Sequence, residues 1–310
     1  MLRFVFTDVS DEVVELNNAV SVVINKEEGV PADDLAVVFP YVSVKELKNV
    51  VVYDNETVVF TGIVDEQIVS VKGDMATLKV CARSMASLLL DNESVPLSYN
   101  YPSQRVVVKN HANRFGINVK DEKTATYFGT QTVGKGSTNW LPLDKFSKNV
   151  YGKGIRVDER GELIFAPQYS GECVFSNDGD GIAYTSLSEV KKRCEEISKV
   201  RIKLTNSSGY HSVVENEDAV KRGIVRERYL NAVLTDTPAV CADNMIRKSK
   251  ENAYVVTINC PGRYLNIFGM NAKIKGDITL HTENLYISSL MYRQSSTQEM
   301  TTVILKRKEV

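Results

Sequence analysis

The sequence predicts a β-rich α+β protein of two or three domains. The chain has 310 residues, whereas a single domain usually has roughly 100–200. Short runs rich in Val, Ile, Phe and Leu, separated by polar turns, occupy both ends of the chain, which is typical of strands. Helical patterns are confined to the middle and to one C-terminal stretch. Hydrophobic residues make up 43% and charged residues 25%, enough to bury a core and stay in solution.

The first third indicates a small antiparallel sheet. Asp54-Asn55-Glu56 is a polar turn between two apolar runs, and Gly73-Asp74 joins another two, as in hairpins. Strands at this spacing without intervening helices are typical of an antiparallel sandwich or barrel. The expected strands are Leu2–Thr7, Ala19–Ile24, Leu35–Val38, Val50–Tyr53, Thr57–Val64, Gln67–Lys72 and Met75–Cys81.

The middle of the chain predicts a small α/β unit. Ser103 suits the N-cap of a helix that ends before Gly116, and Pro142 suits the first turn of another. In order, we expect a short helix over Arg83–Asp91, a boundary at Pro96–Pro102, a helix over Ser103–Phe115, a loop over Thr124–Thr138, a helix over Asn139–Tyr151, and a hairpin of Gly154–Val157 with Glu162–Phe165.

Strand patterns return in the C-terminal half. Thr237-Pro238 fits a cap followed by a first-turn proline, so a helix is expected over Ala239–Ala253. We expect strands at Val200–Leu204, Tyr254–Asn259, Ala272–Ile274, Leu285–Arg293 and Thr301–Lys308, with loops or turns at Thr205–Glu217 and Gln294–Gln298.

Charge is unevenly distributed although the net charge is only −1. Residues 1–96 carry 7 Lys and Arg against 16 Asp and Glu, and the rest carries 31 against 23. Such asymmetry is typical of surfaces that meet something charged, although drift of solvated faces would give the same counts. Short basic clusters at Lys191–Arg193, Arg247–Lys250 and Lys306–Lys308 lack the interleaved aromatic residues of a nucleic-acid platform.

Several classes of protein are not expected. Met1–Asp8 has no secretory-signal pattern, and no apolar run approaches the roughly 20 residues of a membrane span. The cysteines are five in number, widely spaced and without a CxxC pair, so reduced buried thiols are expected rather than a disulfide framework or a zinc site. They are Cys81, Cys173, Cys194, Cys241 and Cys260.

Two loops resemble ligand-binding motifs only in part. Gly129–Ser137 fits G-x-x-x-x-G-K-[ST] until Gly136 takes the place of the magnesium-binding hydroxyl, so a glycine-rich loop is expected. Ser176–Gly181 resembles a calcium loop, but its twelfth position is Leu187 instead of a glutamate, so a polar turn is expected.

No catalytic, cofactor-binding or metal-binding residue is assigned, no cofactor is expected, and the protein is not expected to be an enzyme. His111, His211 and His281 are isolated, and none belongs to a metal motif. His111 falls on the apolar side of its expected helix, which favours a packed histidine. No nucleophile elbow is present.

Two short patterns carry a resemblance to a known family. The hairpin Val51–Asp65 contains F-x-G-x-V, at Phe60, Gly62 and Val64, and the hairpin that follows the Trp140 helix contains R-V-D-x-x-G-x-L-x-F, beginning at Arg156 and ending at Phe165. With Ala82–Pro96, Arg222–Thr235, the helix at Ala239–Ala253, Pro261-Gly262 and the last two strands in the same order, the chain resembles the baseplate hub proteins of contractile phage tails, the late-control-D-like family.

The resemblance implies two small antiparallel β-barrel domains with an α/β domain between them, forming a trimeric pseudo-sixfold ring. The barrels would be residues 1–96 and residues 171–225 plus 266–310; residues 97–170, with 226–265 packed on them, would form the α/β domain. The implied function is a structural adapter between the six-fold tail tube and the three-fold central spike. Implied partners are two further copies, the tube, the spike, other baseplate proteins and DNA passing through the channel.

The implied location is the baseplate of a virion or tail-like bacteriocin particle, including those of defective prophages, assembled in the bacterial cytoplasm. Two alternatives remain open, a tail-associated cell-wall hydrolase and the hub part of a secretion-system spike. A secretion spike would be expected to continue into a needle of β-repeats, which does not follow before Val310. An unrelated adhesin would be expected to carry a secretion signal.

Overall fold

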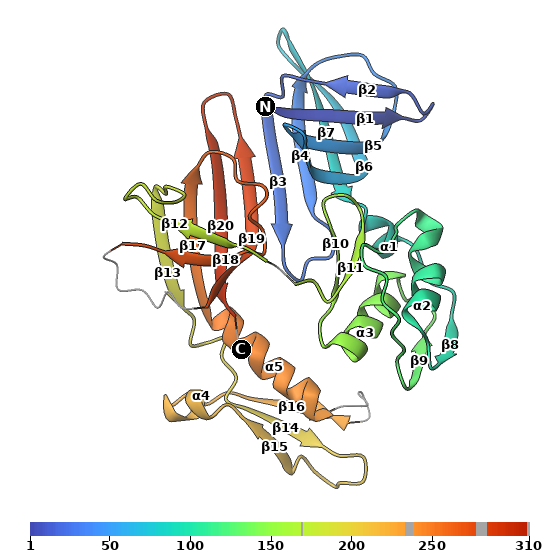
Figure 1. Ribbon diagram of the computed structural model, residues 1–310, viewed down its shortest axis with the longest axis vertical. Coiled ribbons are helices and arrows are strands. Elements are labelled where there is room, and N and C mark those ends of the chain that lie inside the picture. Colours follow the sequence, from blue (N-terminus) through green and yellow to red (C-terminus); the bar gives the residue numbers. More distant parts are fainter. Residues whose placement is uncertain (169, 233–237, 277–283, 309–310) are drawn as a thin grey trace. The chain divides into compact units, whose positions relative to one another are not determined.

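The computed structural model describes residues 1–168, 170–232, 238–276 and 284–308 (Figure 1). Packing divides the chain into two compact units. The first contains Met1–Tyr169, Gly262–Phe268 and Ser289–Thr301; the second contains Ser170–Pro261, Gly269–Ser288 and Thr302–Val310. Strands dominate both units, which confirms the β-rich α+β class. The finer domain division at residues 97 and 171 stays a prediction.

The first unit is built on an antiparallel sheet. Phe4 and Phe6 are buried on alternate positions of the first strand, and Phe39 meets Phe4 edge-on with 5.4 Å between ring centroids. Residues Ser289–Gln294 of β19 (Leu285–Gln294) extend the sheet beside β3. The sheet has the order β2-β1-β5-β6-β7-β4-β3, with β1 (Leu2–Asp8), β2 (Val13–Leu16), β3 (Ser21–Glu27), β4 (Asp34–Pro40), β5 (Leu47–Asp54), β6 (Thr57–Lys72) and β7 (Met75–Ser84).

One long strand, β6, replaces the two that the sequence predicted. The two expected strands are continuous, with a register shift between Val64 and Glu66. Such a shift lets the strand bend without ending its hydrogen-bonded pairing. β6 pairs with β5 only as far as Ile63, but with β7 as far as Lys72. A Cβ at Gly62 would lie 2.2 Å from the carbonyl oxygen of Arg83, so the strands approach too closely there for any other residue.

The rest of the first unit surrounds a second hydrophobic core. Leu89, Val107, Phe146 and Leu163 are among the residues that fill it. The elements are α1 (Ser87–Asp91), β8 (Leu97–Asn100), α2 (Gln104–His111), a 3₁₀ turn (Asn113–Phe115), β9 (Thr130–Val133), α3 (Trp140–Tyr151), β10 (Ile155–Val157) and β11 (Leu163–Phe165). The predicted N-cap is confirmed because Ser103 accepts a hydrogen bond from the amide of Val106.

Two expectations for this region were wrong in part. Arg83 and Ser84 end β7 instead of opening a helix, because the ladder with β4 continues to Arg83. The expected loop at Thr124–Thr138 contains β9. The segment Pro96–Pro102 contains β8, and the domain boundary expected there stays a prediction. These two short strands pair with each other, so each exists only through a distant partner.

The second unit contains two sheets. The larger sheet contains, in order, β13 (Ser186–Lys191), β17 (Tyr254–Pro261), β20 (Glu299–Arg307) and β19. Strand β18 (Asn271–Ile274) lies beside β19, and β12 (Glu172–Phe175) pairs with β18 in parallel. The smaller has the order β15-β14-β16, with β14 (Lys199–Lys203), β15 (Ser212–Glu215) and β16 (Glu227–Asn231). Helix α5 (Pro238–Ala253) packs Ala242 and Ile246 against Val200 and Ile202 of this sheet.

The strands predicted in the C-terminal half are present, but several further elements there were not predicted. The strands expected at Val200–Leu204 and from Tyr254 onward are present, but the loop expected at Thr205–Glu217 contains β15 and the first residue of helix α4 (Glu217–Lys221). The sequence did not predict β2, β12, β13, β16 or α4. The expected cap at Thr237 lies outside the described residues. Among the described helices, none combines the length and the apolar character needed to cross a membrane.

Candidate functional site

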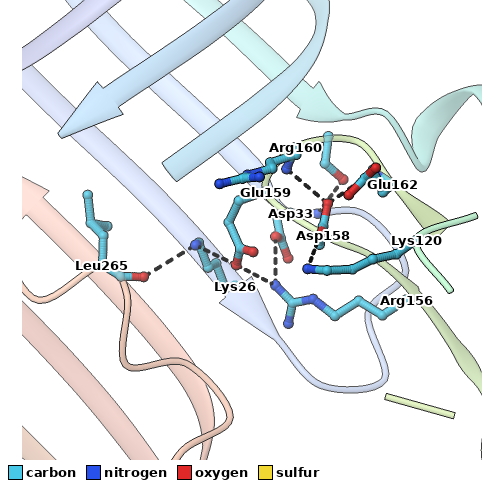
Figure 2. A network of polar contacts seen from close by, with 10 residues as sticks. Lys26, Asp33, Lys120, Arg156, Asp158, Glu159, Arg160, Glu162 and Leu265 are labelled. Carbon is cyan, nitrogen blue, oxygen red and sulfur yellow. Dashed lines mark hydrogen bonds and ion pairs between the residues drawn. The ribbon is translucent and has the colours of Figure 1, made fainter. Parts of the chain in front are cut away.

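A buried charge cluster in the first unit is formed by Lys26, Asp33, Arg156 and Glu159 (Figure 2). The side chain of Lys26 is 1% exposed. Its Nζ lies 2.9 Å from Oε1 of Glu159 and donates a second hydrogen bond, of 3.3 Å, to the carbonyl oxygen of Leu265. A buried ammonium is tolerated only when its protons are paired in this way.

Arg156 links the same carboxylate to a second one. Its Nη2 lies 3.1 Å from Oε1 of Glu159 and 3.3 Å from Oδ2 of Asp33. The guanidinium also stacks over the ring of Phe268, 4.0 Å from the centroid. The cluster therefore joins three segments that are far apart in the sequence: β3 with the loop after it, the β10–β11 hairpin, and residues 265–268.

The two carboxylates of the cluster differ in their ionisation. Burial raises the pKa of Asp33 to about 6, despite the attraction of Arg156 and Lys26. Burial also acts to raise the pKa of Glu159, but the two cations together outweigh it and hold that pKa at about 2. Glu159 is therefore the fixed anion of the cluster, and Asp33 is the group that titrates near neutral pH.

The β10–β11 turn is shaped by the motif that begins at Arg156. Oδ1 of Asp158 accepts hydrogen bonds from the amides of Arg160 and Glu162, each 3.0 Å long, and Oδ2 lies 3.0 Å from Nζ of Lys120. Gly161 has a φ of 84°, which favours glycine. The apolar motif residues Val157, Leu163 and Phe165 are buried, so the motif serves the hairpin and its core.

Sequence reasoning singled out Arg156 but missed the other three members of the cluster. For Lys26 a signal was present: it follows Val22 and Ile24 at alternate positions of one strand, and both valine and isoleucine are fully buried. The alternation of a strand places every second side chain on one face. A lysine at an inward position must therefore have a buried partner, although the alternation does not identify it.

His111 is packed, as the sequence predicted. Its Nδ1 lies 3.1 Å from Oδ1 of Asn139, an atom that can only accept, so Nδ1 carries the proton. Nε2 then accepts a hydrogen bond of 2.9 Å from the hydroxyl of Tyr99. Burial lowers the pKa of the imidazole. The hydroxyl of Ser94 also lies beside Nδ1, at 3.2 Å, so the imidazole belongs to a buried hydrogen-bond network.

The glycine-rich segment Gly129–Ser137 is partly a strand. Residues Thr130–Val133 form β9, and in the turn after it the amide of Ser137 donates a hydrogen bond to the carbonyl of Gly134. The amide of Gly136 donates a 2.7 Å hydrogen bond to the carboxylate of Glu93. A backbone donor that a phosphate loop would present to its ligand is therefore used within the fold.

The other candidate positions are also held by local contacts. In Ser176–Gly181 the amide of Asp178 bonds to the hydroxyl of Ser176, and the Asn177 side chain accepts from the amide of Tyr184. Cys173 and Cys260 are buried free thiols, and burial raises their pKa to about 11 and about 12. Within the described parts of the chain, no cluster of His, Cys, Asp and Glu could hold a metal ion. His281 lies outside the described residues.

Comparison with solved structures relates this fold to known proteins. The chain matches a 43 kDa tail protein of a prophage from Shewanella oneidensis with a TM-score of 0.81 and 14% identity, covering 98% of each chain. It matches a tail protein from Neisseria meningitidis with a TM-score of 0.81 and 16% identity, covering 99% of this chain and 97% of that one.

A more distant match is a component of the type VI secretion system of E. coli that is structurally similar to bacteriophage T4 tail proteins. Its TM-score is 0.58 at 10% identity, over 94% of this chain and 74% of that one. No protein-family model and no curated protein matches the chain. The chain therefore has the fold of prophage tail proteins along nearly its whole length.

Proposed function

We propose that the protein is the structural baseplate hub of a contractile phage tail or of a tail-like particle. One observation carries the proposal: the fold coincides with that of two prophage tail proteins over at least 97% of every chain compared. A match that extends from end to end accounts for both units at once, whereas a shared single domain would leave the rest of the chain unexplained.

In this proposal three copies assemble into a ring that connects the six-fold tail tube to the three-fold spike. Each copy would supply two similar β-barrels, one from residues 1–96 and one from residues 171–225 plus 266–310. Three copies then present six near-equivalent contacts to the tube, while the trimer keeps the symmetry of the spike. The pseudo-sixfold ring, the partners and the passage of DNA through its channel are all part of this proposal.

The role we propose is structural and not catalytic. The residues that could have had a catalytic or ligand-binding role make hydrogen bonds within the fold. His111 lies between Tyr99 and Asn139, and the amide of Gly136 bonds to Glu93. Arg156 and Lys26, which form the buried charge cluster, join segments of the first unit. All of these contacts hold segments of the first unit together, which suits a structural part of an assembly.

A second candidate is the hub part of a secretion-system spike. The match to the E. coli type VI component favours it, because this chain covers 74% of that longer protein with a TM-score of 0.58. The two candidates share the hub body and differ in the particle to which it belongs.

The location of the protein in the particle tests the proposal. A tagged copy would be expressed in a host that produces the particles, and purified particles would be labelled with gold against the tag and viewed by electron microscopy. Label at the baseplate end of a contractile tail supports the hub. Label along the sheath or at the head end, or particles free of the protein, would exclude it, and cleavage of peptidoglycan by the purified chain would favour a hydrolase.

A further inference from the structure

The β6–β7 hairpin continues beyond the part of β6 that β5 covers. Pairing with β5 ends at Ile63, while pairing with β7 runs on to Lys72. The side chain of Gln67 bonds to the backbone at Lys45 and Leu47. After it, residues 68–72 have β7 on one side and no strand on the other among the described residues. This stretch, named here the open edge, is a free strand edge.

Most of the open edge is apolar, whereas the free edge of a sheet usually carries charged residues. Its first four residues are Ile68, Val69, Ser70 and Val71. Val69 is 53% and Val71 is 72% exposed, and Met75, across the turn, is 71% exposed. Free edges normally carry charges, prolines or bulges that prevent pairing with another chain. Within the open edge the only charged residue is Lys72, at its end, and the stretch Ile68–Val71 is uncharged. An uncharged, mostly β-branched stretch of edge is typical of a strand that another strand covers.

The second unit has an edge with complementary chemistry. β13 is the last strand of its sheet, with β17 on one side and no other described strand on its outer side. The strand ends in the exposed Lys191, which pairs with Glu189 of the same strand, and the exposed Lys192 follows it. On β6 the open edge is preceded by Glu66, which is exposed and makes no ion pair among the described residues. The side chain of Lys192 is likewise without an ionic partner in the described part of the chain.

We propose that the open edge of β6 in one copy pairs antiparallel with the edge of β13 in a second copy. The charges favour the antiparallel direction, because it brings Lys192 toward Glu66, whereas a parallel pair would bring Lys191 toward Lys72. The inference rests on the proposed trimer and deepens it, since a contact between two different edges is heterologous, the type of contact from which closed rings are built.

Charge reversal tests the pairing directly. Glu66→Lys and Lys192→Glu are made singly and together, and the mass of each protein is followed by sedimentation across a concentration series. Each single reversal is expected to weaken association about tenfold, a typical size for a close interfacial charge pair, and the double reversal is expected to restore it. Single reversals without effect, or a double variant weaker than both singles, would overturn the proposal.

An apolar substitution with a matched control tests the edge itself. Val71→Asp puts a charge on the open edge, and Val225→Asp puts one at a valine that is 91% exposed in the second unit. Both sites are exposed, so both variants are expected to fold. Val71→Asp is expected to give monomers and Val225→Asp to assemble as wild type; equal assembly of the two would overturn the proposal. A wild-type protein that never associates would instead count against the proposed hub trimer.

Discussion

Lys26 and Glu159 form an ion pair, 2.9 Å from Nζ to Oε1, across 133 residues of sequence. Lys26 belongs to the first antiparallel sheet and Glu159 to the turn of the β10–β11 hairpin. The pair, together with Arg156, connects the sheet to the α/β part of the first unit. The stability of this connection gives the first two predictions.

Lys26→Met is expected to destabilise the protein by about 2–3 kcal/mol. Removal of one partner of a buried pair costs roughly 3–5 kcal/mol, and the loss is smaller here because the side chain of Glu159 is 30% exposed. Thermal unfolding measures it. Glu159→Gln in the same chain should recover part of the loss, since it removes the carboxylate that has lost one of its two cations. A loss of equal size with glutamate or glutamine at 159 would contradict the pairing.

Asp33 is expected to make stability fall as the pH rises from about 4 to about 6. Its pKa is raised from 3.8 to about 6 in the folded protein, so in that window the folded state holds a proton that the unfolded state has lost. The contribution lost amounts to at most about 3 kcal/mol, at 1.36 kcal/mol per pH unit.

Asp33→Asn provides the control for this titration, because asparagine cannot ionise. The stability of the wild type relative to Asp33→Asn should fall across that window and be level above it. Glu159, with its pKa held at about 2, acts in the opposite sense below pH 4.5 and is common to both proteins. A constant difference between the two proteins from pH 4 to pH 7 would contradict the raised pKa.

Gly62→Ala is expected to cost roughly 3 kcal/mol, because overpacking against a rigid backbone is expensive. The new Cβ would meet the Arg83 carbonyl at 2.2 Å. Gly73→Ala is the matched control: it lies in the open β6–β7 turn with a φ of 61° and no atom within 4 Å of a new Cβ, so only backbone strain of about 1 kcal/mol is expected. Equal losses in chemical denaturation would contradict the close approach of the two strands at Gly62.

His111 is expected to remain neutral to a lower pH than an exposed histidine. Because burial lowers its pKa, stability that depends on the neutral ring is fully present above pH 6.5 and is lost as the pH falls toward the folded-state pKa. Nitrogen-15 NMR should show the proton on Nδ1. Tyr99→Phe removes the hydrogen bond to Nε2 and should cost about 1 kcal/mol. A ring protonated at pH 6.5, or a proton on Nε2 in the neutral ring, would contradict the network.

The sequence was informative wherever a local pattern decides the structure. Alternating apolar residues predicted β1 and β3–β7. Cap and proline chemistry placed the start of α2 and both ends of α3 within one residue, but α2 ends at His111, and a 3₁₀ turn covers the rest of the expected helix to Phe115. Short strands whose existence depends on a distant partner escaped it. β8 and β9 are four residues each and are strands only because they pair with each other, and β13 has its pairing partner in β17.

The buried charge cluster shows the same limit at the level of single residues. Arg156 could be singled out because it begins a hairpin motif, and the alternation of β3 marked Lys26 as inward-facing. Asp33 lies before β4 and Glu159 in a turn, where exposed acids are common. Only the folding of distant segments onto one another makes these two carboxylates partners of the same cations.

The mass of the purified protein in solution, measured by light scattering over a range of concentrations, tests the hub account most directly. The account predicts a stable species of about three times the 34.6 kDa chain mass, with a threefold ring in electron micrographs of the same sample. A monomer or a dimer at every concentration would contradict it.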